Sequence, residues 1–455
     1  PKDIKNDTII FVGEDNLHYE KFQDGTVKCI ENEIPFEVPE GWAWCRLKHV
    51  CTMAAGKAKP TDQIMTEPFE GCYPCFGGNG IRGYVDEYNQ DGIFSIVGRQ
   101  GALCGNINIA KGKFYATEHA VVTTLFSGID FNWSNYVLEA LQLNSYATGA
   151  AQPGLSVANV LNVFVPVPPT QEQVHIGIRI AESIKIIENI EDEKENLQTL
   201  ISSAKSKILD LAIRGKLVSQ NPNDEPASVL LERIRAEKEE LIKQGKIKRD
   251  KKESIIFKGE DNSYYLKTGD ITEPLEDWEL DGLPDSWSFC CLGEICDYGN
   301  CINVATVDID DSAWILDLED IEKDTGIVLQ KVRKAKRNSI STKHLFHKGQ
   351  VLYSKLRPYL NKVVLADEDG YCTSEILPLD FQENIIPQYA RYYLMSPTFL
   401  QYTNKCSYGV KMPRLGTVDG KKTIITLPPL AEQKRIVKAI ETIFAQLDEI
   451  SNAIA

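Results

Sequence analysis

The sequence predicts an α/β (α+β) fold in which two tandem globular domains are separated by two long helices that pair as an antiparallel coiled coil. Three observations carry this prediction: an internal repeat with a pseudo-two-fold order, a long proline-free stretch with heptad spacing after the first copy, and a similar stretch after the second. The chain has 455 residues, of which 43% are hydrophobic and 25% charged. This size and composition indicate a globular protein with more than one core.

The repeat consists of three short segments that recur in the same order. In the first segment nine of thirteen positions are identical between the copies, and the last segment is the motif P-P-x-x-E-Q. The offsets lie between 245 and 260 residues, so the chain contains one unit twice. The middles differ between copies and are expected to form short strands with glycine turns, with helices near residues 133–143 and 386–402. The matching segments are residues 9–21 and 255–267, 38–47 and 283–292, and 168–173 and 428–433.

A long helix is expected from residue 168 to about residue 217. Two prolines end the preceding segment, Thr170 can cap the helix, and Gln173 stands where it would complete a capping box. Apolar residues then recur at heptad steps, as they do in the C-terminal segment, so the two helices are predicted to pack along one seam. The predicted seam residues are Ile180, Ile187, Ile190, Leu197, Ile201, Ile208 and Leu211 in the first helix, and Ile436, Ile440, Ile443, Leu447 and Ile450 in the second.

Five segments follow from these signals. The second helix is shorter than the first, so we expect additional helix at one or both ends of the full-length protein. The charged segment between the domains is expected to be a solvated linker helix, although its basic run at 246–252 could alternatively contact a phosphate backbone. The predicted segments are a first globular domain at 1–168, a first spacer helix at 169–218, a charged helical linker at 219–254, a second globular domain at 255–428 and a second spacer helix at 429–455.

The overall charge and the cysteine pattern exclude several classes of protein. A net charge of −15 and a pI near 5.1 argue against a protein that coats nucleic acid indiscriminately, although they allow a local basic patch. The sequence has no signal peptide and no apolar run long enough to span a bilayer, so a cytoplasmic location is predicted. Twelve scattered cysteines indicate reduced thiols, and Cys72 and Cys75 have zinc-like spacing without a second pair. No metal site is predicted.

Signatures of catalysis are missing from the sequence. It contains no Walker motif, no H-E-x-x-H, no G-x-S-x-G and no cluster of carboxylates at metal-site spacing. Glu118 beside His119 has no nucleophile or ligand spacing nearby and is interpreted as structural. We therefore predict no catalytic residues and expect a chain that binds rather than reacts.

Two glycine-rich loops in the first unit present polar side chains. Glycines at 77, 78 and 80 permit tight turns beside Asn79 and Arg82, and glycines at 98 and 101 do the same for Arg99 and Gln100. Arg can bind guanine edges in a bidentate manner, and Asn and Gln can bind adenine edges. These four residues are therefore candidates for contact with DNA bases, and a purely structural glycine turn remains the alternative.

The second unit contains a strongly basic segment. Residues 331–362 include ten Lys or Arg and no Asp or Glu, within a chain that is acidic overall. We interpret this segment as a DNA-facing surface, with an acidic protein partner as the alternative. The loops at 148–156 and 408–416 also share the order glycine, proline, leucine. The predicted DNA-binding residues of the chain are Asn79, Arg82, Arg99, Gln100, Gln152, Arg333, Lys334, Lys336, Arg337, Lys355, Arg357, Tyr359, Lys411 and Arg414.

Together these motifs resemble the specificity (S) subunits of type I restriction-modification systems. The resemblance rests on the repeated P-P-x-x-E-Q helix starts, on ILDLAIRGKLVSQNPNDEPASVLLERIRAEKEELIKQGKIK at 208–248, and on GGNGIRGY at 77–84. It rests also on GRQGALCGN at 98–106 followed by FYATEHAVV. It covers essentially the whole chain.

The resemblance implies a division of roles along the chain. Residues 1–168 and 255–428 would be target-recognition domains that each read one half of a bipartite DNA site, and the two conserved helices would fix the gap between the halves. The helices would also dock two modification (M) subunits, which use S-adenosylmethionine, and restriction (R) subunits, which use ATP and Mg, would join them. This chain would itself hold no cofactor. A related type IIB-like system and a coiled-coil adaptor that binds only proteins are the alternatives.

Overall fold

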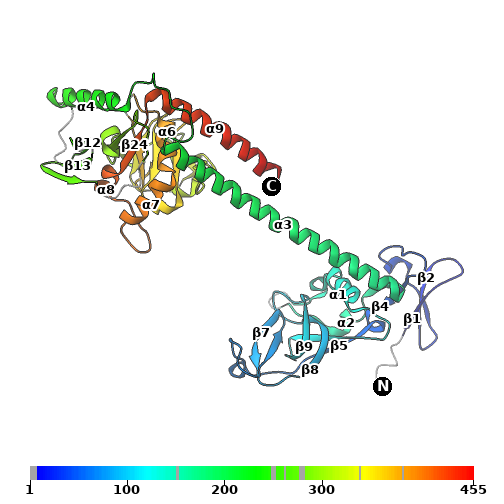
Figure 1. Ribbon diagram of the computed structural model, residues 1–455. Helices are drawn as coiled ribbons and strands as arrows, with labels where there is room; N and C mark the ends of the chain where they lie inside the picture. The colour runs from blue at the N-terminus through cyan, green and yellow to red at the C-terminus, as the bar shows by residue number, and fades with distance from the viewer. Residues whose placement is uncertain are drawn as a thin grey trace. The chain divides into compact units, whose positions relative to one another are not determined.

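The computed structural model describes residues 8–149, 153–246, 253–260, 263–275, 282–337, 340–381 and 384–454 (Figure 1). The chain forms two compact units, Pro1–Glu191 and Asp192–Ala455, which we call unit 1 and unit 2. Their boundary falls inside the long helix α3 (Thr170–Ile213), which therefore begins in unit 1 and ends in unit 2.

Unit 1 is built on a six-stranded sheet in the order β5-β10-β8-β9-β6-β7, in which only β6 and β9 run parallel. A three-stranded meander β1-β2-β3 and the pair β11-β4 complete its strands. The bounds are β1 Thr8–Val12, β2 His18–Phe22, β3 Val27–Cys29, β4 Ala43–Arg46, β5 Cys51–Ala55, β6 Tyr73–Gly77, β7 Gly80–Val85, β8 Gln90–Gly98, β9 Ile107–Ala116, β10 Ala120–Leu125, α1 Phe131–Ala140, α2 Val157–Val160 and β11 Phe164–Val167.

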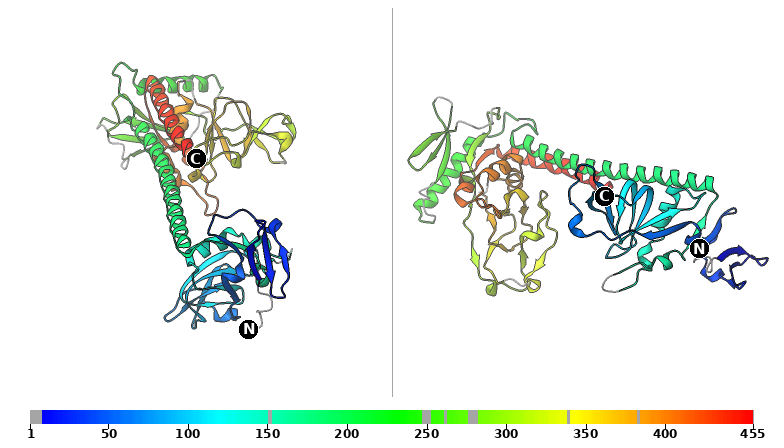
Figure 2. Two further views of the ribbon diagram at one scale, coloured as in Figure 1. Left: turned by 90° about the vertical axis from the view of Figure 1, so that its right-hand side faces the viewer. Right: turned by 90° about the horizontal axis from the view of Figure 1, so that it is seen from below.

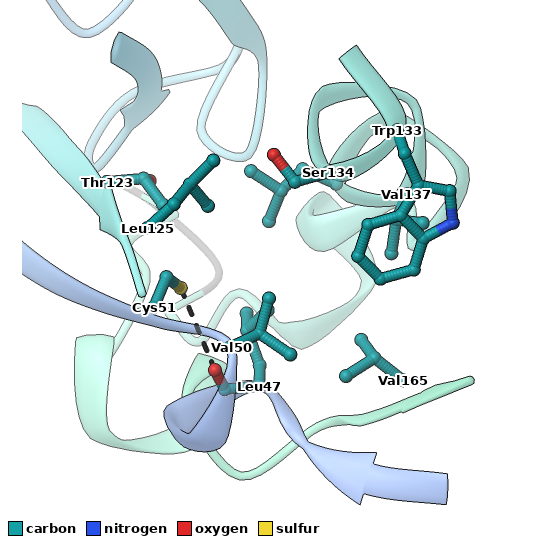
Figure 3. Close-up of a pocket in the computed structure, with 10 residues that line it drawn as sticks. Leu47, Val50, Cys51, Thr123, Leu125, Trp133, Ser134, Val137 and Val165 are labelled. Atoms are coloured by element: carbon teal, nitrogen blue, oxygen red, sulfur yellow. Dashed lines mark hydrogen bonds between the residues drawn. The ribbon is translucent and has the colours of Figure 1, made fainter. Parts of the chain in front are cut away.

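The core of unit 1 lies between the sheet and α1. Trp133 and Leu138 of α1 pack with Leu47, Val97 and Val121 in one buried cluster. Figure 3 shows a small cavity inside this core, lined by apolar and small polar side chains from the region between β4 and β5, from β10 and from α1. The cavity has a volume of about 10 Å³. Ligand pockets are roughly 300–1,000 Å³, so this cavity reflects core packing.

Unit 2 contains a five-stranded sheet β16-β19-β22-β17-β18, a three-stranded sheet β21-β20-β23, a meander β12-β13-β14 and the pair β15-β24. Its strands are β12 Ser254–Lys258, β13 Tyr264–Thr268, β14 Ile271–Pro274, β15 Ser288–Cys291, β16 Asn303–Val304, β17 Trp314–Leu316, β18 Val332–Arg333, β19 Lys343–Phe346, β20 Val351–Ser354, β21 Val363–Leu365, β22 Gly370–Thr373, β23 Ile376–Leu379 and β24 Ile424–Leu427. Its helices are α4 Ala227–Lys243, α5 Leu292–Ile295, α6 Pro387–Leu394, α7 Pro397–Cys406, α8 Thr417–Lys422 and α9 Leu430–Ala453.

The two units share a strand register in their middle parts, where their sequences differ. Residues that pair across β8 and β10 in unit 1 have counterparts across β20 and β23 in unit 2, always 256 positions further along the chain. The pairs of β8 with β9 correspond to those of β20 with β21 at the same offset. The corresponding pairs are Gly98–Ala120 with Ser354–Ile376, and Val97–Ile107 with Tyr353–Val363.

The end of α3 lies antiparallel to α9 within unit 2 (Figure 2). The carbonyl of Ile213 at the end of α3 accepts a hydrogen bond from Thr426 Oγ1, just before α9 begins. Earlier in α3, Lys205 forms an ion pair with Asp448 near the end of α9 and lies 5.3 Å from the ring centroid of Phe444. These contacts agree with the predicted antiparallel pairing of the two helices over this stretch.

The seam between these helices is shorter than predicted and shifted. The residues of α3 that enter the core of unit 2 are Leu209, Ala212 and Ile213. The end of α3 packs against the body of unit 2 and not against a single helix, so its buried residues follow the 3.6-residue helical period and not the heptad spacing of a coiled coil. The predicted Leu211 is only partly buried. The other predicted seam residues divide into the buried Ile201, Ile436 and Ile440, the partly buried Ile180, Ile208, Ile443 and Leu447, and the exposed Ile187, Ile190, Leu197 and Ile450.

The predicted capping box at the start of α3 is wrong. The hydroxyl of Thr170 donates to the carbonyl of Gly128 at 2.9 Å. The buried side chain of Gln173 accepts a hydrogen bond from the Asp130 N–H at 2.8 Å and donates to the Pro168 carbonyl at 2.9 Å. Gln173 therefore ties the start of α3 to the start of α1, which a local capping rule cannot anticipate because the partner is distant in sequence.

The second P-P-x-x-E-Q motif makes the same connection in unit 2. Gln433 is fully buried, accepts a hydrogen bond from the Ile386 N–H at 2.9 Å and donates to the Pro428 carbonyl at 3.1 Å. In both units the glutamine thus joins the long helix to the helix that follows the sheet. This explains why the motif recurs.

Two further expectations are corrected in unit 2. The charged segment between the domains is not a solvated linker, because Ala227, Leu230, Leu231 and Ile234 of α4 are buried in the core of unit 2. The helix expected at 386–402 is two helices, α6 and α7. Ser396 caps the start of α7, and Pro397, which cannot continue α6, is its first residue.

Candidate nucleic-acid interface

Three segments that are distant in sequence meet at one place in each unit. They are the loop after β8 or β20, the turn that precedes β10 or β23, and a short hairpin before the final strand. We call these the unit 1 loop cluster and the unit 2 loop cluster. They comprise residues 98–106, 117–119, 148–149 and 153–154 in unit 1, and residues 354–362, 373–375 and 408–414 in unit 2.

The same backbone hydrogen bonds hold both clusters together. In each cluster, the backbone N–H of the second loop residue donates a hydrogen bond to a carbonyl of the turn, and the carbonyl of the same residue accepts one from the leucine after the hairpin. The backbone N–H of the fourth loop residue donates to the carbonyl of the hairpin proline. The loose correspondence predicted between residues 148–156 and 408–416 is thereby confirmed for their described residues. The bonds are Arg99 N to His119 O (2.9 Å), Leu155 N to Arg99 O (2.9 Å) and Gly101 N to Pro153 O (3.0 Å), and Lys355 N to Glu375 O (3.0 Å), Leu415 N to Lys355 O (3.0 Å) and Arg357 N to Pro413 O (2.7 Å).

The fourth loop residue has left-handed backbone geometry in both units. Gly101 has a φ of 97°, a conformation that glycine adopts without strain. Its counterpart Arg357 has a φ of 49°, which is strained for a residue with a Cβ. Strained backbone of this kind tends to occur at functional sites. The conformation presents an exposed arginine at the centre of the unit 2 loop cluster.

The loop clusters also carry cations that the protein does not neutralise. The side chains of Arg99, Lys355, Arg357 and Lys411 make no hydrogen bond or ion pair with any described residue. Three of these four belong to the unit 2 loop cluster, where Tyr359 is also 49% exposed. Arg357 and Lys411 are exposed, whereas Arg99 and Lys355 are partly buried. Unpaired cations in one cluster with an exposed aromatic side chain suit a polyanion such as DNA.

The remaining predictions for unit 1 are placed as follows. Gln100 is exposed on the loop of the cluster. Asn79 is exposed on the turn between β6 and β7, where its Oδ1 accepts a hydrogen bond from Asn106 Nδ2 at 2.9 Å. This contact brings Asn79 to the cluster. Arg82 lies on β7 and donates to Thr61 Oγ1 at 2.9 Å, whereas Gln152 lies outside the described residues.

Arg414 differs from the other cations of the unit 2 loop cluster because it has a partner. Its guanidinium donates to both carboxylate oxygens of Glu375, from Nε at 3.1 Å and from Nη2 at 2.8 Å. The hydrogen bonds from Arg414 outweigh partial burial and lower the pKa of Glu375, and the same contact raises the pKa of Arg414. The pair remains charged across the neutral range and fixes the plane of the guanidinium.

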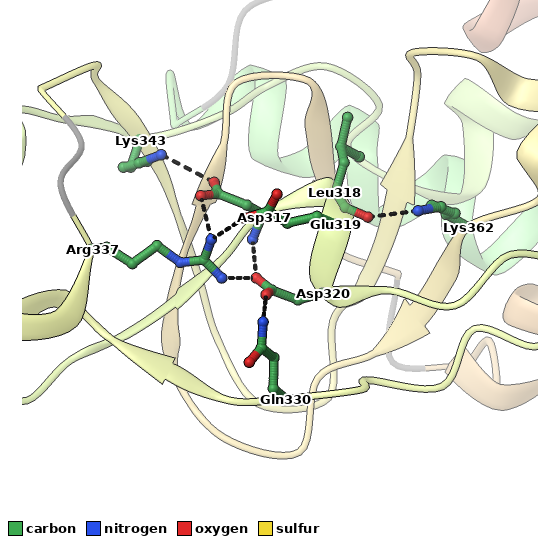
Figure 4. Close-up of polar contacts among 8 residues, drawn as sticks. All are labelled: Asp317, Leu318, Glu319, Asp320, Gln330, Arg337, Lys343 and Lys362. Carbon is green, nitrogen blue, oxygen red and sulfur yellow. Dashed lines mark hydrogen bonds and ion pairs between the residues drawn. The ribbon is translucent and has the colours of Figure 1, made fainter. Parts of the chain in front are cut away.

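The first part of the basic segment is largely neutralised by carboxylates from elsewhere in unit 2 (Figure 4). Arg337 is only 10% exposed in its side chain and contacts the carboxylates of Asp317, Glu319 and Asp320. Burial opposes its charge, but these carboxylates outweigh burial and raise the pKa of Arg337. An arginine held in this way stabilises the fold and cannot reach a base without breaking three ion pairs.

Neighbouring cations of this segment are paired as well. Lys334 contacts Asp311 at 2.9 Å, and Arg333 contacts Glu368 at 2.9 Å. Lys336 is exposed and has no ion pair among the described residues. The segment contains no acidic residue, but carboxylates from other parts of unit 2 neutralise Arg333, Lys334 and Arg337. This part of the surface is therefore less positive than the sequence predicts.

The middle of α3 exposes many large apolar side chains. The whole stretch 181–191 is exposed, and so are most residues up to 200. A soluble helix rarely leaves such a stripe uncovered unless another protein binds it. The exposed residues are Ile184, Ile186, Ile187, Ile190, Leu197 and Leu200.

Sequence reasoning missed the turn residues of each cluster. Glu375 was not selected, and Glu118 and His119 were interpreted as structural. The constant offset of 256 positions between FYATEHAVV at 114–122 and residues 370–378 was the signal that could have linked them. At this offset only Tyr and Thr recur, and the acidic residue that follows is displaced by one position, so the sequence match is too faint to reveal the correspondence without the strand register.

The described part of the chain offers neither a membrane-spanning helix nor a metal centre. None of its helices is both long and apolar enough to cross a membrane, and no group of His, Cys, Asp or Glu is arranged to hold a metal ion there. Cys75 is buried and Cys72 accepts a hydrogen bond from the Phe69 N–H at 3.3 Å.

The chain thus combines two repeated units, each with an equivalent loop cluster, and two long helices that each follow one unit's final strand. The family model for the type I restriction modification DNA specificity domain matches residues 39–199 and 284–455, which is well over half of the chain. The chain belongs to this family.

Curated relatives and a solved structure agree with this assignment. The type I restriction enzyme EcoprrI specificity subunit of Escherichia coli is 46% identical over 132 residues, which span 29% of this chain and 33% of that relative. The EcoDI specificity subunit of Escherichia coli is 21% identical over 92% of this chain and 86% of its own length. A chain from structural work on complex assembly and conformational transition of the type I R-M system has 16% identity and a TM-score of 0.53, with 92% of this chain and 94% of that chain covered. This last likeness supports the fold.

Proposed function

We propose that this chain is the specificity subunit of a type I restriction-modification complex and that each unit reads one half of a bipartite DNA site. Family membership supports the subunit assignment. The single observation that carries the half-site assignment is the pair of loop clusters, which share three backbone hydrogen bonds but differ in their exposed side chains. One backbone frame with two sets of side chains is what a protein needs to read two different sequences.

The proposed DNA contacts follow from exposure and pairing. Gln100, Arg99 and Asn79 would serve the first half-site, while Lys355, Arg357, Tyr359, Lys411 and Arg414 would serve the second. Lys336 and Arg82 remain candidates at the edges of these sites. Arg333, Lys334 and Arg337 are left out of the proposed interface, because their charges are already neutralised by carboxylates.

The proposed partners are duplex DNA, two modification subunits and the restriction subunits, all in the cytoplasm. The exposed apolar stripe of α3 supports a protein partner on that helix. The chain itself would be non-catalytic, with S-adenosylmethionine on the modification subunits and ATP and Mg on the restriction subunits. Its contribution is to place those subunits on a chosen sequence.

Genome-wide mapping of N6-methyladenine tests this function. The chain is produced with its modification subunit in a host without adenine methylation. We expect one bipartite motif with a fixed gap, and a control culture that lacks this chain should show no motif. Methylation without a bipartite motif, or a complex that forms without any preference among DNA sequences, would instead support an adaptor that binds only proteins.

A further inference from the structure

The turn in each loop cluster carries different chemistry in the two units. Residues 117–119 correspond to residues 373–375, because both turns accept the hydrogen bond from the second loop residue at the same position. His119 therefore corresponds to Glu375. In the facing hairpins, Gly154 corresponds to Arg414, since each closes its hairpin with the residue six positions earlier.

In unit 2 these two positions form a fixed ion pair. Glu375 accepts from Nε and Nη2 of Arg414, and Arg414 Nη1 also reaches the Met412 carbonyl at 3.4 Å. The Arg414 side chain is still 33% exposed, so part of its donor fork faces outward from the hairpin. A guanidinium held by a carboxylate loses little further entropy when it binds a second acceptor.

In unit 1 the corresponding side chains have no such partner. Gly154 offers no side chain, and the side chains of Glu118 and His119 form no ion pair with any described residue other than each other, with 3.4 Å between Oε1 and Nε2. The second oxygen of Glu118 and the Nδ1 of His119 are shielded from solvent and have no hydrogen-bond partner within the described part of the chain. Buried polar atoms without partners are rare in proteins and require an explanation.

On the basis of the proposed function, we propose that the turn and the facing hairpin of each loop cluster determine base specificity in the half-site that the unit reads. Glu375 is a positioning residue that presents Arg414 to a guanine, whereas the carboxylate of Glu118, whose side chain is 38% exposed, accepts the amino group of a base. Arginine pairs with guanine O6 and N7, and glutamate accepts from cytosine N4. The unit 2 loop cluster thus offers a donor from its hairpin, and the unit 1 loop cluster offers an acceptor from its turn.

The sign of the charge strengthens this assignment. A carboxylate beside DNA repels the phosphates and weakens binding to every sequence. A partly exposed Glu118 that pairs with no Lys or Arg among the described residues is therefore unfavourable in a DNA-facing cluster unless a base compensates for it. Replacing Glu118 with Gln should for this reason strengthen binding to non-cognate DNA while it weakens discrimination at one base pair.

The test compares base preferences of the full chain by selection from a randomised duplex pool. The variants are Glu118→Gln, His119→Ala, Glu375→Ala, Glu375→Gln and Arg414→Ala, with Glu368→Gln as a matched control. Glu368 also pairs with an arginine, but lies outside both clusters. Glu375→Ala and Arg414→Ala should lower discrimination at the same base pair of one half-site by about five- to 150-fold. Glu375→Gln should retain part of this discrimination, since the amide oxygen can still accept a hydrogen bond from Arg414.

The unit 1 variants should change one position of the other half-site, and Glu368→Gln should change neither half. Unaltered preferences in the unit 1 and unit 2 variants, or an equal loss of binding to all sequences, would overturn the inference while the proposed function stands. A wild-type chain that selects no motif would overturn the proposed function, and the inference with it.

Discussion

The two units place the same backbone around the P-P-x-x-E-Q motif but complete it differently. In unit 2, the buried Glu432 accepts hydrogen bonds from Trp287 Nε1 at 3.0 Å and from Gln220 Nε2 at 2.5 Å. In unit 1, the corresponding Glu172 is exposed, and Trp42 Nε1 has no hydrogen-bond partner within the described residues. The glutamine of the motif thus makes the same hydrogen bonds in both units. The glutamate is buried and hydrogen-bonded only in unit 2, where Trp287 and Gln220 supply the donors.

The same lesson holds for the loop clusters. Their backbone hydrogen bonds join equivalent partners at 2.7 to 3.0 Å, while nearly every side chain on them differs. Backbone bonds do not depend on side-chain identity, so they can keep a reading frame fixed while the exposed residues change. The two loop clusters therefore share their backbone conformation and differ in the side chains that they expose.

The largest difference between the units should follow from truncating the helix after the motif. Ile436 is fully buried in unit 2, whereas its counterpart Ile176 is only partly buried. Ile436→Ala should destabilise unit 2 by about 2–5 kcal/mol. Ile176→Ala should destabilise unit 1 by clearly less. Denaturant titration followed by hydrogen exchange in peptides of each unit measures both, and equal losses would contradict the comparison.

A second pair of variants tests the tryptophans. Trp287→Phe leaves the buried Glu432 without one donor, which should destabilise unit 2 by about 1–3 kcal/mol beyond the loss of packing. Burial raises the pKa of Glu432 against its hydrogen bonds, so the carboxylate is sensitive to this loss at neutral pH. Trp42→Phe removes an N–H that has no described partner. It should therefore change the free energy of unfolding only through packing, as the same measurement would show.

The fourth residue of the loops offers an exchange in both directions. Gly101→Ala should destabilise unit 1 by about 1 kcal/mol, because a Cβ there meets no neighbouring atom and only the left-handed backbone opposes it. Arg357→Gly should leave unit 2 as stable or slightly more stable while weakening DNA binding. Thermal unfolding and fluorescence anisotropy of a labelled duplex would record the two effects. A destabilised Arg357→Gly variant would show that its strain has been misjudged.

The smallest effect concerns acidification. The pKa of Glu375 is lowered in the folded chain, so its pairing with Arg414 contributes stability above the unfolded pKa near 4.5 and loses it as pH falls through the folded pKa. Unit 2 of the Glu375→Gln variant should consequently lose less stability than the wild type between pH 5 and about pH 3. Unit 1, which has no equivalent ion pair, serves as the internal control. Parallel acid profiles of the two proteins would contradict this account.

Much of the architecture could be predicted from the sequence because it is recorded in local patterns. The repeat, the two long helices and the glycine loops at 77–80 and 98–101 are all short-range signals. The neutralisation of Arg337 could not be predicted, since Asp317 and Asp320 precede it by about twenty residues and reach it only through the fold. The role of Gln173 was missed for the same reason.

Photo-crosslinking tests the central claim most directly. A photoreactive amino acid is placed at position 100 in the unit 1 loop cluster, at position 357 in the unit 2 loop cluster, or at the exposed control position 307. Each protein is irradiated on a duplex that carries the methylated bipartite motif. Positions 100 and 357 should crosslink to opposite half-sites, and position 307 to neither. Crosslinks from both loop clusters to the same half-site, or from neither cluster, would contradict the claim that each unit reads one half.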